Sequence, residues 1–286
     1  MKKYLSIDIG GTNIKHGLYN EKGEELKPGG QTPTDRDTLE GFLHSLSEAI
    51  SQYTDIDGIA LSVPGKVDKD TGFLHHAGSI RVLDGVDLRK YLCEKYNVPT
   101  TIENDANCAV LAEHWLGNGK DCENLVCITI GTGIGGGIII NNRIYRGSGS
   151  YSGEFCFMYT NLDAGEENVF NNLSTTHLIK KVNAEASISI ANGKDFFDNM
   201  DNPIIKNFYD AWIKDLAVCV YNIGVAFDPE KILLGGGVSG QTGIVKDINE
   251  VIKRIALRSY SWTVDVCKFG NDAGKIGAVY NLLNTK

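Results

Sequence analysis

Two separate stretches of this chain share one arrangement, in which an apolar strand runs into a glycine-rich turn and a second apolar strand follows. The first stretch reads IDIGGTNIKHGLYN (residues 7–20) and the second reads ITIGTGIGGGIIIN (residues 128–141). Aligned without gaps, they match at four positions: Ile7 with Ile128, Ile9 with Ile130, Gly10 with Gly131, and Asn20 with Asn141. This internal similarity predicts two related halves, each opened by a strand–turn–strand unit.

Strand and helix patterns alternate around these two units, which predicts an α/β fold with mixed sheets. Apolar runs that end in turns predict strands, and helical spacing behind capping residues such as Thr38 predicts helices. The predicted strands are residues 4–9, 57–65, 99–103, 231–237 and 263–269; the predicted helices start behind residues 37–38 and cover 87–96, 106–115, 202–227, 243–258 and 272–284. A chain of 286 residues has room for about two domains.

Composition excludes several classes of function. The formal charge is −8 with no block of basic residues, so we expect no nucleic-acid partner. The apolar run at the N-terminus is too short for a signal peptide and no 18-residue apolar stretch occurs, so we expect a cytoplasmic protein without a membrane partner. The 7 cysteines are scattered without a CxxC, which favours reduced, packed thiols over zinc or disulfides.

Three glycine clusters each follow an apolar strand: DIGGT (8–12), GTGIGGG (131–137) and LGGGVSG (234–240). Glycine in such turns lets backbone N–H groups approach an anion closely, and a neighbouring threonine hydroxyl adds a donor. No cluster is a Walker A motif or a Rossmann fingerprint. Each alone could be a structural turn, but together they favour a bound nucleotide. The candidate cofactor-binding residues are Gly10, Gly11, Thr12, Gly131, Thr132, Gly133, Gly135, Gly235, Gly236 and Gly237.

Asp8 stands at a strand end directly before the first glycine cluster. A carboxylate in that position can hold Mg²⁺ on nucleotide phosphates, directly or through water. The alternative is an aspartate that caps the following turn. Lys15 could offset phosphate charge or could simply be solvated.

Taken together, DIGGTNIK, SVPGKVD, ENDANC, TIGTGIGGG and LGGGVSG resemble the ROK family of sugar kinases and repressors, in the family's order and over nearly the whole chain. The resemblance implies the two-domain actin-like ATPase and sugar-kinase (ribonuclease H-like) fold, with ATP and sugar in an inter-domain cleft. It also implies a small domain of residues 1–117 completed by residues 271–286, a large domain of 118–270, and a homodimer. DIGGT and GTGIGGG would be the phosphate motifs, LGGGVSG part of the adenosine site, and Asp105 the general base.

The segment YSGEFCFMY (151–159) departs from the family pattern. Family members typically carry a sugar-binding glutamate followed three positions later by a zinc-binding histidine, and then a cysteine motif. Here Glu154 is present, Phe157 occupies the histidine position, and residues 158–175 contain no cysteine, so no structural zinc is expected. Glu166 and Glu167 do not have the spacing of the family's second glutamate. This combination looks most like the zinc-lacking β-glucoside kinases, which phosphorylate the 6-hydroxyl of cellobiose-like sugars.

The stretch IENDANC (102–108) carries the densest chemistry. A carboxylate near the attacking hydroxyl can take its proton during phosphoryl transfer, and an amide can hydrogen-bond sugar hydroxyls. We therefore predict Asp105 as general base and substrate ligand, and Asn104 as a sugar ligand. Glu103 is the competing base, ranked second because strand alternation turns it away. Asp105 could instead be only a helix N-cap, and Cys108 is expected in the core.

Two further residues complete the predicted sugar site. Glu154 can accept hydrogen bonds from sugar hydroxyls, and Gly65 can present its backbone to the sugar. Cys156 could be a nucleophile, but a packed thiol is favoured. The predicted function is an ATP-dependent 6-kinase for a β-glucoside or hexose. A glucokinase, an N-acetylmannosamine kinase, a sugar-responsive regulator and an actin-like ATPase remain open, the regulator disfavoured because no DNA-binding segment precedes the first strand.

Overall fold

A computed structural model describes residues 1–68, 70–159, 170–241 and 243–285 of the chain. The chain folds into two compact units, one of Met1–Lys120, Ile144–Ser152 and Asn271–Lys286, and one of Asp121–Arg143 and Gly153–Gly270. The division expected from sequence differs at residues 118–120 and 144–152, which it assigns to the domain of residues 118–270. In the structure these residues group with the first unit.

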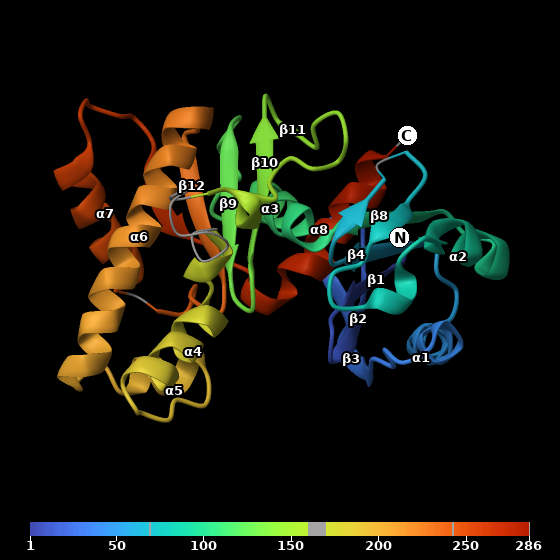
Figure 1. Cartoon of the computed structure of the whole chain (residues 1–286). Helices are drawn as coiled ribbons and strands as arrows, with labels where there is room; N and C mark the ends of the chain where they lie inside the picture. The colour runs from blue at the N-terminus through green and yellow to red at the C-terminus, as the bar shows by residue number, and fades with distance from the viewer. Residues whose placement is uncertain (69, 160–169, 242, 286) are drawn as a thin grey trace. The chain divides into compact units, whose positions relative to one another are not determined.

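The first unit is built on a five-stranded sheet in the order β3-β2-β1-β4-β8, with a small sheet β5-β6-β7 beside it. Its elements, labelled in Figure 1, are β1 (Tyr4–Ile9), β2 (Asn13–Tyr19), β3 (Glu25–Pro33), α1 (Leu39–Ser51), β4 (Gly58–Val63), β5 (Lys66–Val67), β6 (Phe73–His76), a 3₁₀ turn at Arg81–Leu83, β7 (Val86–Asp87), α2 (Leu88–Tyr96), β8 (Thr100–Asn104), α3 (Asp105–Leu116) and α8 (Ala273–Asn284). Thr38 caps α1 as predicted, accepting a hydrogen bond from the Gly41 amide at 3.0 Å.

The two faces of this sheet are covered differently. Large apolar side chains of β1, β2 and β4 pack against α1 and α2, as Ile7, Phe42 and Leu92 illustrate. Small residues line the other face, where Ala60 and Cys108 pack with Ala278 of α8. A Cβ added to Gly277 would lie 1.8 Å from the Cys108 carbonyl oxygen, so α3 and α8 touch backbone to backbone.

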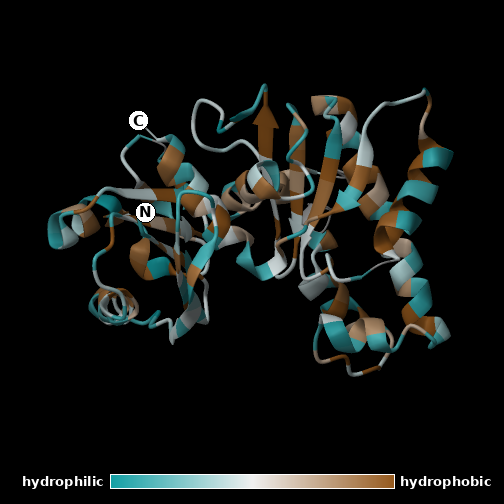
Figure 2. Cartoon of the chain, turned by 180° about the vertical axis from the view of Figure 1, so that it is seen from behind, coloured by the Kyte–Doolittle hydropathy of each residue, from teal (hydrophilic) through white to brown (hydrophobic). Residues whose placement is uncertain are grey.

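The second unit is built on a five-stranded sheet in the order β11-β10-β9-β12-β13. Its elements are β9 (Leu125–Ile130), β10 (Ile134–Ile140), β11 (Arg143–Ile144, at the boundary of the units), 3₁₀ turns at Phe155–Phe157 and Phe170–Leu173, α4 (Thr175–Glu185), α5 (Gly193–Asp198), α6 (Pro203–Phe227), β12 (Lys231–Gly236), α7 (Ile244–Ile255) and β13 (Thr263–Val266). A further 3₁₀ turn, Gly270–Asp272, also lies at the boundary of the units. The core packs strand residues such as Ile128 and Leu234 against α6 and α7. Figure 2 shows hydrophobic residues along these strands and mixed residues on the helices.

The two main sheets have the same plan. In each, the first strand pairs antiparallel with the strand after its glycine turn (β1 with β2, β9 with β10) and parallel with a later strand (β4, β12). That strand in turn pairs parallel with the edge strand (β8, β13). The internal repeat predicted from the sequence is thus confirmed. Across the described ranges, no helix is both long and apolar enough to cross a bilayer.

Candidate functional site

Four polar residues stand in one row across the first sheet. Asp8 on β1 pairs with Lys15 on β2 and with Ser62 on β4, and Ser62 pairs with Glu103 on β8. Residues paired across neighbouring strands project to the same face of a sheet. All four side chains therefore belong to the face that α3 and α8 cover, where Ser6 on β1 also donates to the Lys275 carbonyl oxygen of α8.

The carboxylate of Asp8 lies against the first turn of α8. Ser62 Oγ donates to Asp8 Oδ1 at 2.7 Å, and a Cβ added to Gly274 would come within 2.5 Å of that same oxygen. Burial raises the pKa of Asp8, and the Ser62 hydrogen bond and the charge of Lys15 partly oppose this. A carboxylate oxygen is a ligand that Mg²⁺ prefers, so the residues present fit the predicted metal role of Asp8.

The first glycine turn joins β1 to β2 and is closed by backbone hydrogen bonds. Gly10 N donates to Asn13 O at 3.0 Å, and Thr34 donates from its amide to Thr12 O at 3.0 Å. Thr12 is exposed, so its hydroxyl can reach a ligand. Sequence reasoning missed Arg36, whose guanidinium would lie 3.7 Å from a Cβ on Gly11. An arginine beside a phosphate-type turn supplies positive charge that the motif itself lacks.

The corner between β8 and α3 carries the predicted base. The sequence offered Asp105 as the possible N-cap of α3, but the cap is Asn104, whose Oδ1 accepts from the Asn107 amide at 3.0 Å. Asp105 is instead the first residue of α3, and its Oδ1 accepts from the amide of Ala106 at 2.8 Å. Asp105 is exposed in a segment that is otherwise buried or half-buried. The corner thus presents one carboxylate to solvent.

Asn104 also fixes the turn that contains Gly65. Asn104 Nδ2 donates to Gly65 O at 2.9 Å, which joins the β4–β5 turn to the start of α3. Gly65 has φ +91° and a Cβ there would lie 2.0 Å from His76 O, so only glycine fits. An amide carries two donors and two lone pairs, so Asn104 keeps one of each for a substrate after these two contacts. The carbonyl of Gly65 is used by Asn104, which leaves its N–H as the group it would present.

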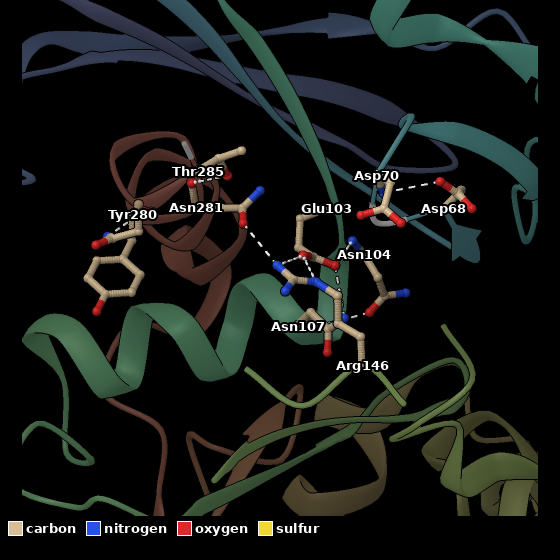
Figure 3. Close-up of polar contacts among 10 residues, drawn as sticks. Asp68, Asp70, Glu103, Asn104, Asn107, Arg146, Tyr280, Asn281 and Thr285 are labelled. Carbon is tan, nitrogen blue, oxygen red and sulfur yellow. Dashed lines mark hydrogen bonds and ion pairs between the residues drawn. The ribbon is translucent and has the colours of Figure 1, made fainter. Parts of the chain in front are cut away.

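Glu103 is engaged inside the first unit. Its side chain is 5% exposed, and Oε1 accepts from the Asn104 amide and from Asn107 Nδ2, both at 2.9 Å. Oε2 accepts from Arg146 Nε at 2.7 Å, and Arg146 Nη2 donates to Asn281 Oδ1 at 3.1 Å (Figure 3). Both oxygens of this carboxylate already accept from protein donors, which supports ranking Glu103 below Asp105. Sequence reasoning missed Arg146 and Asn281.

Cys108 is fully buried on α3, as expected of a core thiol. Burial raises its pKa well above the ordinary value, and the carboxylates of Glu103, Asp8 and Asp105 raise it further. The thiol stays neutral and serves packing.

The second unit contains a pocket of about 500 Å³ that both of its glycine clusters border. Gly131 and Thr132 come from the β9–β10 turn, and Gly237 follows β12. A Cβ on Gly131 or Gly237 would meet no atom within 4 Å, so these glycines leave their backbone open to a ligand. Gly235 and Gly236 instead allow close packing, since a Cβ on Gly236 would lie 2.4 Å from Ile130 O. The remaining lining residues are Thr175, Thr176, Ile179, Ala191, Asn192, Gly193, Lys194, Phe197 and Gln241.

The start of α4 borders the same pocket. Ser174 caps this helix by accepting from the His177 amide at 3.3 Å, and Thr175 N donates to Gly131 O at 3.0 Å. Thr175 Oγ1 is buried and has no hydrogen-bond partner among the described residues. Helix N-termini favour anions, while Ile179 and Phe197 supply apolar surface of the kind a nucleobase needs. The residues present thus fit a nucleotide, although sequence reasoning had singled out only the glycine clusters.

Glu154 belongs to the second unit and precedes the 3₁₀ turn Phe155–Phe157. It is half-buried, and Cys156 Sγ lies 3.7 Å from its Oε2. Burial and the Glu154 charge raise the pKa of Cys156 to about 12, which argues against a nucleophile. Phe157 is exposed. No set of three or more His, Cys, Asp or Glu side chains is arranged for a metal ion in the described part of the chain, and Glu166 and Glu167 lie outside it.

Comparison with known proteins gives consistent matches over the full length. Residues 4–285 match the model of the ROK family. A β-glucoside kinase of Listeria innocua is 32% identical, over 98% of this chain and 97% of the relative. The crystal structure of a ROK family protein from Streptococcus pneumoniae in complex with sucrose superposes with a TM-score of 0.90 at 30% identity, covering 98% of both chains. A ROK hexokinase from Thermus thermophilus gives 0.85 at 25% identity, covering 98% of this chain and 97% of the hexokinase. The predicted sugar-kinase fold is thereby confirmed.

Proposed function

Because the chain belongs to the ROK family, we propose that it is an ATP-dependent carbohydrate kinase that transfers the γ-phosphate to the 6-hydroxyl of a β-glucoside. The observation that carries the proposal is the β8–α3 corner. There an exposed carboxylate, Asp105, stands beside Glu103, whose carboxylate is fully occupied by protein donors. Asp105 is the solvent-facing carboxylate of the two, and it takes the proton of the sugar hydroxyl as its oxygen attacks phosphorus.

Asn104 and Gly65 orient the sugar next to this base. The second N–H and second lone pair of the Asn104 amide bind ring hydroxyls, and the Asn104–Gly65 hydrogen bond keeps both groups in place. Glu154 accepts from sugar hydroxyls, an assignment supported by the family pattern rather than by a contact. Positioning of this kind supplies much of the rate in phosphoryl transfer, since the protein forms no bond to the phosphoryl group.

The nucleotide binds to the pocket of the second unit, which both glycine clusters of that unit border. The open backbone at Gly131 and Gly237, the Thr132 hydroxyl and the start of α4 support this assignment. Asp8, with Lys15 paired beside it, would hold Mg²⁺, which would supply positive charge to offset that of the nucleotide phosphates. We keep a homodimer and a cytoplasmic location as predictions.

A β-glucoside is preferred as substrate for two reasons. Several relatives near 32% identity over nearly the full chain are named β-glucoside kinases, and Phe157 stands where zinc-binding members have histidine. The S. pneumoniae relative, which is named with sucrose bound, supports room for a disaccharide. The main alternatives are a glucokinase, the name of a Halalkalibacterium halodurans relative at 29% identity, and an N-acetylmannosamine kinase.

A substrate panel tests the proposal. With Mg²⁺ and ATP in excess, kcat/KM is measured for cellobiose, glucose, fructose and N-acetylmannosamine. The proposal predicts the highest value for cellobiose, by about tenfold or more over glucose, because the second ring adds binding energy. A profile led by glucose or N-acetylmannosamine would reject the β-glucoside in favour of an alternative. ATP hydrolysis without any sugar phosphate formed would reject the kinase.

A further inference from the structure

Arg146 pairs with a buried carboxylate from a distant part of the sequence. Its side chain is 23% exposed and that of Glu103 is 5% exposed, and Arg146 Nε donates to Glu103 Oε2 at 2.7 Å. The second contact of Arg146 goes to Asn281 on α8 at 3.1 Å. Figure 3 shows the guanidinium between Glu103 and Asn281, with Asn107 and Asn104 beside it. The contact explains why residues 144–152 group with the first unit.

Glu103 in turn holds the backbone that carries the proposed base. Its Oε1 accepts from the Asn104 amide and from Asn107 Nδ2. Asn104 caps α3 through the Asn107 amide, and Asp105 lies between these two residues. The direction in which α3 starts, and so the position of the Asp105 side chain, depends on the side chain at position 103 keeping these hydrogen bonds.

A buried carboxylate without a counter-charge does not keep such a geometry, because burial penalises the charged form. Among the residues that the structure describes, Arg146 forms the ion pair with Glu103. The guanidinium also matches a carboxylate better than an ammonium group does, since its donors are fixed in a plane.

We propose that Arg146 is a positioning residue for Asp105, which it holds in place by neutralising Glu103. This inference rests on the proposed function, in which Asp105 is the base. Arg146 itself touches neither sugar nor phosphate in this account. It follows that Arg146 is needed only while position 103 carries a charge.

A double-variant cycle tests this consequence. Arg146→Met leaves Glu103 buried and unpaired, and we expect kcat to fall about 100-fold while KM for ATP and sugar stays within about threefold. Glu103→Gln alone should keep kcat within about fivefold. The double variant, with both charges removed, should have a kcat at least about tenfold higher than that of Arg146→Met. A double variant no faster than Arg146→Met, or a loss found in KM, would overturn the proposal and indicate direct contact with a substrate.

Three controls separate the role of Arg146 from other causes of lost activity. Arg143→Met changes an exposed arginine three positions before Arg146 and should leave kcat and KM unchanged. If Arg146→Met does not fold, Glu103→Gln is compared with the double variant, and turnover lost only in the double variant contradicts the inference. Asp105→Asn is measured in parallel. If it retains turnover, the proposed base is wrong; if it is inactive and no rescue occurs, only the role of Arg146 is wrong.

Discussion

Gly274, in the first turn of α8, leaves the space in which the carboxylate of Asp8 lies. A Cβ on Gly274 would be 2.5 Å from Asp8 Oδ1 and 3.0 Å from Ser62 Oγ. The same helix meets α3 at Gly277, where a Cβ would be 1.8 Å from Cys108 O. The C-terminal helix thus reaches the first-unit row of polar residues at Asp8, and small residues make this approach possible.

Gly274→Ala should lower both stability and activity. Alanine normally stabilises a helix by about 1 kcal/mol relative to glycine. A free energy of unfolding that is instead lower by about 1–3 kcal/mol would therefore indicate the clash with Asp8. Moving that carboxylate should also lower kcat/KM for ATP by about tenfold. Urea unfolding and steady-state kinetics measure the two effects. Gly243→Ala is the control, because Gly243 has φ −81° and no atom within 4 Å of an added Cβ. If the two variants show the same change in the free energy of unfolding and in kcat/KM, the predicted clash with Asp8 is contradicted.

Asp8→Asn should raise the stability of the metal-free protein at neutral pH. The pKa of Asp8 is raised on folding, chiefly by burial, so its ionised form weakens the fold above the unfolded-state pKa of 3.8. Stability therefore increases as pH falls through the raised pKa. Thermal unfolding in EDTA should show a melting temperature a few degrees higher for Asp8→Asn at pH 7. This difference should shrink toward pH 4. A variant less stable than wild type at pH 7 would show that the carboxylate is favourable in place.

Thr132→Val should weaken ATP binding without affecting the sugar. The hydroxyl is exposed at the pocket of the second unit, and valine keeps its shape but removes the donor. Loss of one hydrogen bond to a phosphate predicts a KM for ATP about tenfold higher, with the KM for sugar unchanged. Thr263→Val, at an exposed threonine that begins β13, is the matched control. If the KM for sugar rises instead, the nucleotide assignment of this turn is wrong.

Local sequence patterns predicted most elements of the fold. The strand at Lys231–Gly236 and the helix at Pro203–Phe227 agree with the predicted ranges to within a residue or two. The strand has a continuous apolar run that ends in glycines, and the helix has a long apolar pattern behind the N-cap Asn202. The glycine clusters correctly marked the two related sheets. The N-cap of α3 was misplaced by one residue, because Asn104 and Asp105 are both good capping residues and sequence does not choose between them.

Residues that act through long-range pairing were missed. Arg146 meets Glu103 43 positions earlier and Asn281 135 positions later. Nothing in the local pattern around Arg146 indicates either partner. Thr175 and Phe197 likewise join the glycine pocket through tertiary packing alone. The cap motif Ser174-Thr175-Thr176 was the one signal that could have drawn attention to α4.

The most direct measurement compares turnover and sugar binding in Asp105→Asn. Asparagine keeps the size of the side chain and its hydrogen bond to the Ala106 amide but cannot take a proton. With cellobiose, Mg²⁺ and ATP, kcat should fall by about 10²–10⁴-fold, the usual contribution of a general base. The dissociation constant for cellobiose, measured by calorimetry, should stay within about threefold. If Asp105→Asn keeps most of its turnover, Asp105 is not the base, and the central claim fails.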